Sequence, residues 1–184
     1  MASNPSLETA LALFRQHGGV VRTGEALNLG IHPRTLYAMR DSGLLQPLAR
    51  GLYRLADLPP LSNPDLVIVA RKLPQAIICL VSALAFHELT TQVPHRVDVA
   101  LPNRAERPVL AYPPLQVFRF SGLAWSEGIE IHHLDNTPVR IYGPAKSVAD
   151  IWKYRRKLGQ DVALEALKLY RQRCDFDVNQ LLLM

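Results

Sequence analysis

The segment that decides the fold is Gly24–Leu55, GEALNLGIHPRTLYAMRDSGLLQPLARGLYRL. It contains a short helical stretch, a tight turn at Asn28–Gly30, a second helical stretch, and two short apolar runs separated by a turn with glycine. This order of elements is typical of a winged helix-turn-helix, whose second helix enters the major groove of DNA. The sequence therefore predicts a DNA-binding regulator.

The second helix of this segment is predicted to begin at Pro33 and to end at Gly43. Proline is tolerated at the first helical position, and glycine accepts the left-handed conformation that ends a helix. Leu36 and Met39 fall on the buried side of the helix. A helix in the major groove reads base edges mainly from its first turns, so the outward residues are candidates for base or phosphate contact. The best candidates are Arg34, Thr35 and Tyr37, and His32 and Arg40 flank them.

The two apolar runs, Leu45–Leu48 and Leu52–Leu55, are predicted to form a hairpin, the wing. Arg50 lies at its tip and Arg54 follows closely. Two guanidinium groups there can clamp a backbone phosphate or reach into the minor groove. The alternative is that the unit is a protein–protein module and that these arginines are solvated surface residues.

Composition is that of a folded, soluble protein with one large or two small domains. The chain has 184 residues, is 48% hydrophobic, and carries a formal net charge of +5. Cys79 and Cys174 are the two cysteines, too few for a disulfide framework, and the longest apolar stretch, Ala76–Ala85, is too short to span a bilayer. We therefore expect a cytoplasmic protein.

Adjacent prolines in Asp57–Pro64 mark the predicted boundary between two domains. Residues 1–58 form the winged helix-turn-helix, and residues 59–184 form the second domain. In the second domain, helical patterns flank a region of alternating residues that begins at Arg96 and predicts a small antiparallel sheet of about four strands. The predicted fold class is α+β. The chain stops on an apolar run, Leu181–Met184, which indicates a helix cut short or a tail that faces a partner.

A second basic surface is predicted in the helix that follows Gly143. Its cations alternate with aromatic residues, a composition that suits a polyanion or an acidic protein. The alternative is a helix end whose cations complement the helix dipole. The residues are Lys153, Arg155, Arg156 and Lys157.

Residues that resemble catalytic or metal-binding motifs form incomplete sets. His87-Glu88 begins like a zinc-protease motif, but Thr91 stands where the second histidine belongs. His132 and His133 are neighbours in a predicted strand and so point to opposite faces. Asp98 resembles the first acid of a nuclease, yet no acid-x-lysine follows in the later strands. The sequence predicts no enzyme, no catalytic residue, no metal site and no cofactor.

Several segments together resemble the AbiEi-like antitoxins of bacterial type IV toxin-antitoxin systems, which act in abortive infection as a phage defence. The segments are Gly18–Leu55 with its terminal LARGLYRL, then SALAFHELT, VDVALP and PAKSVADIWKYRRKLG, and they extend over nearly the whole chain. The resemblance implies a winged helix that represses its own operon at inverted repeats, and a second domain that opposes a nucleotidyltransferase-like toxin. It also implies that basic residues of both domains bind DNA.

These features and the resemblance together predict a transcriptional autorepressor and antitoxin whose partners are double-stranded DNA and a cognate toxin. The sequence leaves two alternatives open. One is a winged-helix regulator of another operon, with a ligand-sensing or dimerising second domain. The other is a nuclease fused to a winged helix.

Overall fold

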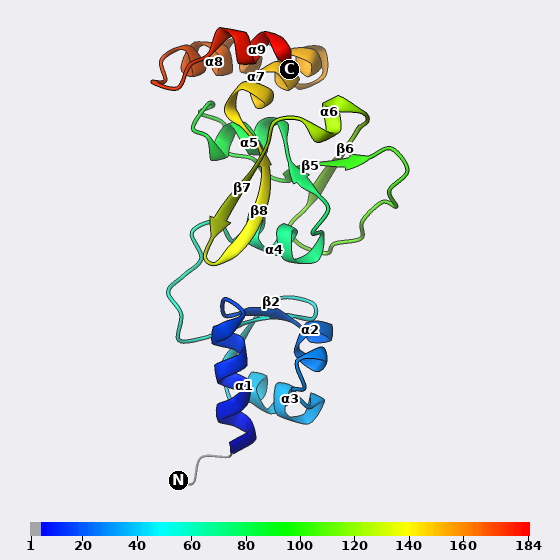
Figure 1. Ribbon diagram of the computed structural model, residues 1–184, viewed down its shortest axis with the longest axis vertical. Helices are drawn as coiled ribbons and strands as arrows, with labels where there is room; N and C mark the ends of the chain where they lie inside the picture. Colours follow the sequence, from blue (N-terminus) through cyan, green and yellow to red (C-terminus); the bar gives the residue numbers. More distant parts are fainter. Residues whose placement is uncertain (1–4) are drawn as a thin grey trace.

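Apolar residues gather into separate clusters along the chain, and the molecule accordingly has two lobes stacked along its long axis (Figure 1). The computed structural model describes residues 5–184. The N-terminal lobe runs from α1 to β3, and the C-terminal lobe runs from α4 to α9. Both lobes mix helices and strands, so the predicted α+β class is confirmed.

The N-terminal lobe is a three-helix unit with a small antiparallel sheet in the strand order β1-β3-β2. Phe14, Leu36 and Met39 fill its core and are fully buried. The winged helix-turn-helix prediction is confirmed. The elements are α1 (Pro5–Gln16), β1 (Val20–Arg22), α2 (Thr23–Asn28), α3 (Pro33–Asp41), β2 (Leu45–Ala49) and β3 (Leu52–Leu55).

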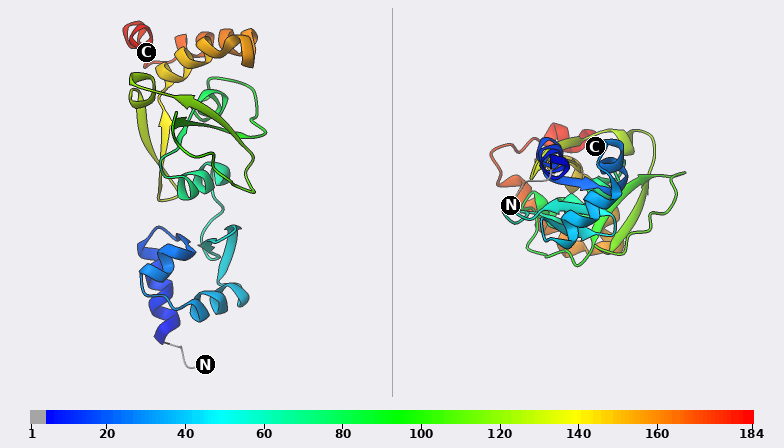
Figure 2. Two further views of the ribbon diagram at one scale, coloured as in Figure 1. Left: turned by 90° about the vertical axis from the view of Figure 1, so that its right-hand side faces the viewer. Right: turned by 90° about the horizontal axis from the view of Figure 1, so that it is seen from below.

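The C-terminal lobe is built on a five-stranded sheet in the order β6-β5-β4-β8-β7. Helices α7, α8 and α9 lie at the end of the molecule farthest from the N-terminal lobe in both side views (Figures 1 and 2). The elements are α4 (Pro64–Lys72), β4 (Ile77–Ile78), α5 (Leu80–Phe86), β5 (Val97–Pro102), β6 (Leu115–Phe120), α6 (Leu123–Ser126), β7 (Ile129–Leu134), β8 (Thr137–Tyr142), α7 (Pro144–Leu158), α8 (Gln160–Arg171) and α9 (Val178–Leu183).

The expectation of an antiparallel sheet is wrong, because the sheet is mixed. Strands β5 and β6 pair in parallel, with Val97 opposite Leu115, and β4 pairs in parallel with β8. The connection 103–114 returns the chain to the start of the sheet before β6 begins, which parallel pairing requires. The two-residue strand β4 joins the halves of the sheet, and it lies inside an apolar run that carries no alternation.

The core of the C-terminal lobe contains a buried ion pair between Lys146 and Asp150 on α7. The Lys146 ammonium also lies over the rings of Phe120 and Tyr142, 5.2 and 4.8 Å from their centroids. Burial raises the pKa of Asp150, and the neighbouring Lys146 opposes this shift. The first turns of α7 therefore carry a buried ion pair on the side that packs into the core.

The two lobes are joined by polar and apolar contacts as well as by the chain. Arg71 on α4 donates hydrogen bonds to the carbonyl oxygens of His17 (2.9 Å) and Val20, and lies 3.8 Å from the carboxylate of Glu25. Ile68 of α4 packs against the N-terminal lobe in a cluster with Val20 and Leu52. Division into independent domains at residue 58 stays a prediction.

Candidate nucleic-acid interface

Helix α3 is fixed at its start by its own cap. His32 precedes the helix, and its Nδ1 accepts a hydrogen bond from the backbone N–H of Arg34 (3.2 Å). Pro33 occupies the first turn. Helix α3 ends at Asp41, two residues before the predicted Gly43, which has a φ of 77° in the turn that follows. His32 thus orients the helix in addition to being exposed beside it.

The exposed face of α3 carries Arg34, Tyr37 and Arg40. Within residues 5–184, no side chain pairs with the guanidinium group of Arg34. Arg40 lies over the Tyr37 ring, 5.0 Å from its centroid, and its Nη2 is 2.7 Å from the carboxylate of Asp41. Hydrogen bonding to Asp41 raises the pKa of Arg40. Of these two cations, Arg34 is the one whose charge is free for a DNA ligand.

Thr35 is half-buried, and its hydroxyl lies 3.3 Å from that of Ser6 on α1. This contact turns Thr35 toward the helix packed behind α3. It leaves Thr35 less available to a base edge than Arg34 or Tyr37.

The hairpin tip lies against the C-terminal lobe. Arg50 keeps an exposed side chain, while its carbonyl oxygen accepts a hydrogen bond from Lys72 of α4. Gly51 has a φ of 66°, a conformation that favours glycine at this turn. The wing is therefore anchored at its tip, and Arg50 can contact DNA only from that position.

A cationic groove surrounds this tip, defined by Arg22, Arg50 and Lys72. The groove encloses a cavity of about 480 Å³. Among the residues that the structure describes, those that line the groove include no aspartate or glutamate. Partial burial lowers the pKa of Lys72, and the charges of Arg22 and Arg50 lower it further. Three like charges without a carboxylate form a site that favours an anion such as a phosphate. Arg22 and Lys72 carry no local sequence signal for this groove, because strand pairing and lobe packing bring them to the hairpin.

Arg54 does not belong to this interface, so the expectation that it contacts DNA is wrong. Its side chain is buried, with 5% of the residue exposed. Its Nη2 donates hydrogen bonds to the carbonyl oxygens of Leu58 (2.9 Å) and Pro59 (2.5 Å). Arg54 thus holds the segment that leaves β3, and its guanidinium is not exposed to a phosphate.

The second basic surface lies on α7, at the opposite end of the molecule from α3 (Figures 1 and 2). Lys153 donates to the Met184 carbonyl (2.7 Å), Arg155 lies over the Trp152 ring, and Lys157 lies over the Phe118 ring. Arg156 is exposed on the same helix. The four basic residues therefore lie on one helix, far from Arg34 on α3.

The nuclease candidate Asp98 is buried in β5, where Val81 N–H donates to its carboxylate (3.2 Å). Burial raises its pKa to about 6, against the opposing effect of Arg96, the Val81 N–H and Lys157. None of these groups is a carboxylate that could share a metal ion with Asp98. The buried Asp98 carboxylate instead accepts a backbone hydrogen bond from the first turn of α5.

Comparison with known proteins identifies the segment that contains this interface. Residues 8–56 match the family model described as transcriptional regulator, AbiEi antitoxin. The resemblance to AbiEi-like antitoxins is thereby confirmed for this segment, which contains α2, α3 and the wing. The description of this family is that of a transcriptional regulator and antitoxin.

The fold of the longer chain also has a known counterpart. The crystal structure of the RV2827C protein from Mycobacterium tuberculosis matches with a TM-score of 0.52 and 18% sequence identity. The match covers 82% of this chain and 61% of that chain, so this chain spans about three fifths of its length. The comparison with curated proteins gives no match. In residues 5–184, no helix combines the length and the apolar character needed to cross a membrane.

Proposed function

We propose that the protein is a DNA-binding transcriptional autorepressor that also acts as the antitoxin of a type IV toxin-antitoxin system. The match of residues 8–56 to an antitoxin regulator family supports the general role. The proposed partners are an inverted-repeat operator in double-stranded DNA and a nucleotidyltransferase-like toxin, and the proposed location is the cytoplasm.

The observation that carries the DNA-binding proposal is the asymmetry of α3. Leu36 and Met39 anchor one face in the core, while Arg34 and Tyr37 stand exposed on the other. A rigid helix with an exposed, unpaired arginine near its N-terminus fits the major groove, where arginine recognises guanine. We assign base contact to Arg34 and Tyr37.

Phosphate contact is assigned to the cationic groove of Arg22, Arg50 and Lys72. Phosphate contacts position a protein on DNA without reading its sequence, and they supply much of the affinity. The groove supplies three cations from three segments of the chain. An inverted-repeat operator requires two copies of α3, so we propose that two chains bind one operator.

The antitoxin role is assigned to the C-terminal lobe. The second basic surface on α7 lies far from α3 (Figure 1), and it is therefore available to a partner while α3 is bound to DNA. We propose that this end of the molecule opposes the toxin. It does so either by binding the toxin directly or by counteracting the effect of the toxin in the cell.

A regulator of another operon is the second candidate, since the family match ends at residue 56. In that case the C-terminal lobe would sense a ligand or mediate dimerisation. Co-expression with the product of the adjacent gene separates the two: rescue of growth from a toxic neighbour supports the antitoxin, whereas an innocuous neighbour favours the second candidate.

Fluorescence anisotropy with the DNA upstream of the protein's own gene tests operator binding. We expect Arg34→Ala to weaken binding to this DNA by about 10-fold or more, the loss of one bidentate base contact. Arg171→Ala removes the same charge from the exposed end of α8 and should bind as the wild type does. Equal affinity of Arg34→Ala and wild type would contradict the assignment of α3 as the reading helix.

A further inference from the structure

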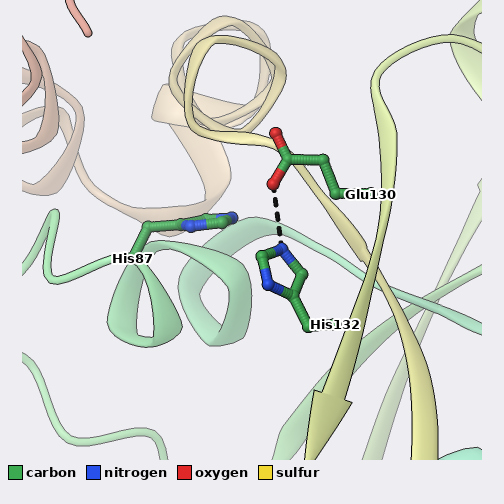
Figure 3. Close-up of side chains that lie close together, drawn as sticks. All are labelled: His87, Glu130 and His132. Carbon is green, nitrogen blue, oxygen red and sulfur yellow. Dashed lines mark hydrogen bonds and ion pairs between the residues drawn. The ribbon is translucent and has the colours of Figure 1, made fainter.

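His87, Glu130 and His132 form a cluster in the C-terminal lobe that the proposed function does not use. His87 follows the last residue of α5, while Glu130 and His132 are alternate residues of β7 and so lie on one face of the strand. One ligand atom from each residue can be chosen so that all three lie within 4.8 Å of one another. In Figure 3 the ring of His87 points toward the carboxylate of Glu130 and the ring of His132.

Two imidazoles and one carboxylate are the protein ligands of many zinc sites that keep a fourth position open. Donor atoms around a tetrahedral zinc ion lie about 3.3 Å apart, given bonds of about 2.0 Å. His132 Nε2 and Glu130 Oε2 are already 2.9 Å apart. The donor atom of His87 lies within 4.8 Å of the other two, so rotation of the side chains toward a common point would complete the ligand set.

The surroundings of the cluster orient these side chains. His87 Nε2 lies 2.8 Å from the Tyr142 carbonyl oxygen, the kind of contact that orients metal-bound histidines. Ligation through Nδ1 would retain this hydrogen bond, and ligation through Nε2 would replace it. The Phe86 ring packs edge-on against both imidazoles, with centroids 5.1 Å from His87 and 4.8 Å from His132.

The cluster is sheltered on one side and open on the other. His87 is buried, with 8% of the residue exposed, whereas the side chains of His132 and Glu130 are 31% and 45% exposed. An ion can thus enter from solvent past β7, and its remaining position would face water.

We propose that His87, Glu130 and His132 bind one divalent transition-metal ion, with zinc as the preferred probe. The ion would take the place of the hydrogen bond between His132 Nε2 and Glu130 Oε2, with the Nδ1–H tautomer of His132 as the metal ligand. It would link the end of α5 to the edge strand β7 and so stabilise the C-terminal lobe. The sequence predicts no metal site, because His87 lies 43 residues before Glu130 and the neighbour of His132, His133, points to the opposite face of the strand.

The direct test is calorimetric titration of the full chain, stripped of metal with a chelator, with zinc chloride. We expect one zinc ion per chain in the wild type. His132→Ala should weaken binding by more than about 100-fold, since losing even an outer-shell partner costs 10- to 100-fold. His133→Ala is the matched control, because His133 is an exposed histidine on the opposite face of β7 and should leave binding unchanged.

Glu130→Gln provides a second variant with the same size and without the charge, in case His132→Ala does not fold, as judged by circular dichroism. Zinc should raise the melting temperature of the wild type and of His133→Ala, and leave Glu130→Gln unchanged. Absence of zinc binding to the wild type overturns the proposal. Equal zinc binding by wild type, His132→Ala and Glu130→Gln also overturns it, because other residues would then hold the ion.

Discussion

Lys146 and Asp150 form an ion pair one turn apart on α7, with each side chain only 1% exposed. Removing two charges from water costs several kcal/mol, and the attraction between them offsets this cost only while both are present. The pair also stands beside Gly128, where a Cβ would approach Lys146 to 2.8 Å. Glycine at position 128 therefore leaves room for the Lys146 side chain to reach Asp150.

Lys146→Met should destabilise the protein by about 3–5 kcal/mol, because it leaves the buried Asp150 carboxylate with only the more distant Lys153, 3.9 Å away, as a cation. The double variant Lys146→Met/Asp150→Leu should recover most of this loss. Urea unfolding followed by circular dichroism measures both. A single variant as stable as the wild type would show that Asp150 does not depend on Lys146.

Asp98 should make stability depend on pH between about 4 and 6. Burial raises its pKa from 3.8 to about 6, so in this range the folded state binds more protons than the unfolded state. The free energy of unfolding should therefore fall as pH rises from 4 to 6, by about 3 kcal/mol at most, and stay level above 6. Asp98→Asn should lack this component. Melting temperatures of both proteins across the range measure the difference, and parallel curves would contradict it.

The cationic groove should contribute affinity without specificity. Arg22→Ala and Lys72→Ala should each weaken binding to operator and to random DNA alike, and lower the slope of log K against log salt by about one unit. Arg54→Ala is the contrasting variant: its loss should lower the melting temperature, since Arg54 binds the carbonyls of Leu58 and Pro59. Loss of operator binding alone by Arg22→Ala would instead indicate base contact.

The second basic surface should be dispensable for operator binding. Because α7 and α3 lie at opposite ends of the molecule, Arg155→Ala/Arg156→Ala should bind a single operator site with wild-type affinity (Figure 1). The same variant should rescue toxin-expressing cells less well. A loss of operator affinity equal to that of Arg34→Ala would reverse this assignment.

Repression and antitoxin activity should be separable within the full chain. Arg34→Ala/Arg50→Ala removes cations from α3 and the wing and leaves the C-terminal lobe unchanged. We expect this variant to lose repression of a promoter reporter while it still rescues cells that express the neighbouring toxin. Loss of rescue, at wild-type protein levels, would mean that neutralisation needs DNA binding.

Local sequence signals predicted the N-terminal lobe well, because its elements are consecutive and marked by turn residues. Pro33 and Gly43 placed α3 to within two residues of its observed end. The burial of the Arg54 side chain was not predictable from local sequence signals, since it depends on where the chain turns after β3. Arg54, the second arginine of LARGLYRL, is predicted to be exposed, yet its guanidinium group binds the carbonyl oxygens of Leu58 and Pro59.

Long-range pairing explains the errors in the C-terminal lobe. Alternating residues marked β5 to β8, but alternation does not distinguish a parallel from an antiparallel neighbour. The same limit hid the cationic groove and the histidine cluster. Arg22 meets Lys72 only once the two lobes pack together, and His87 meets His132 only once α5 packs beside β7.

The contact of Arg71 with the backbone of His17 and Val20 has a mechanical consequence. Arg71 belongs to α4, yet its hydrogen-bond acceptors lie between α1 and the start of β1, within the lobe that carries the reading helix. Any partner that displaces α4 must therefore either break these hydrogen bonds or carry α3 with it. The side chain of Arg71 thus couples the position of α4 in the C-terminal lobe to the position of the DNA-reading lobe.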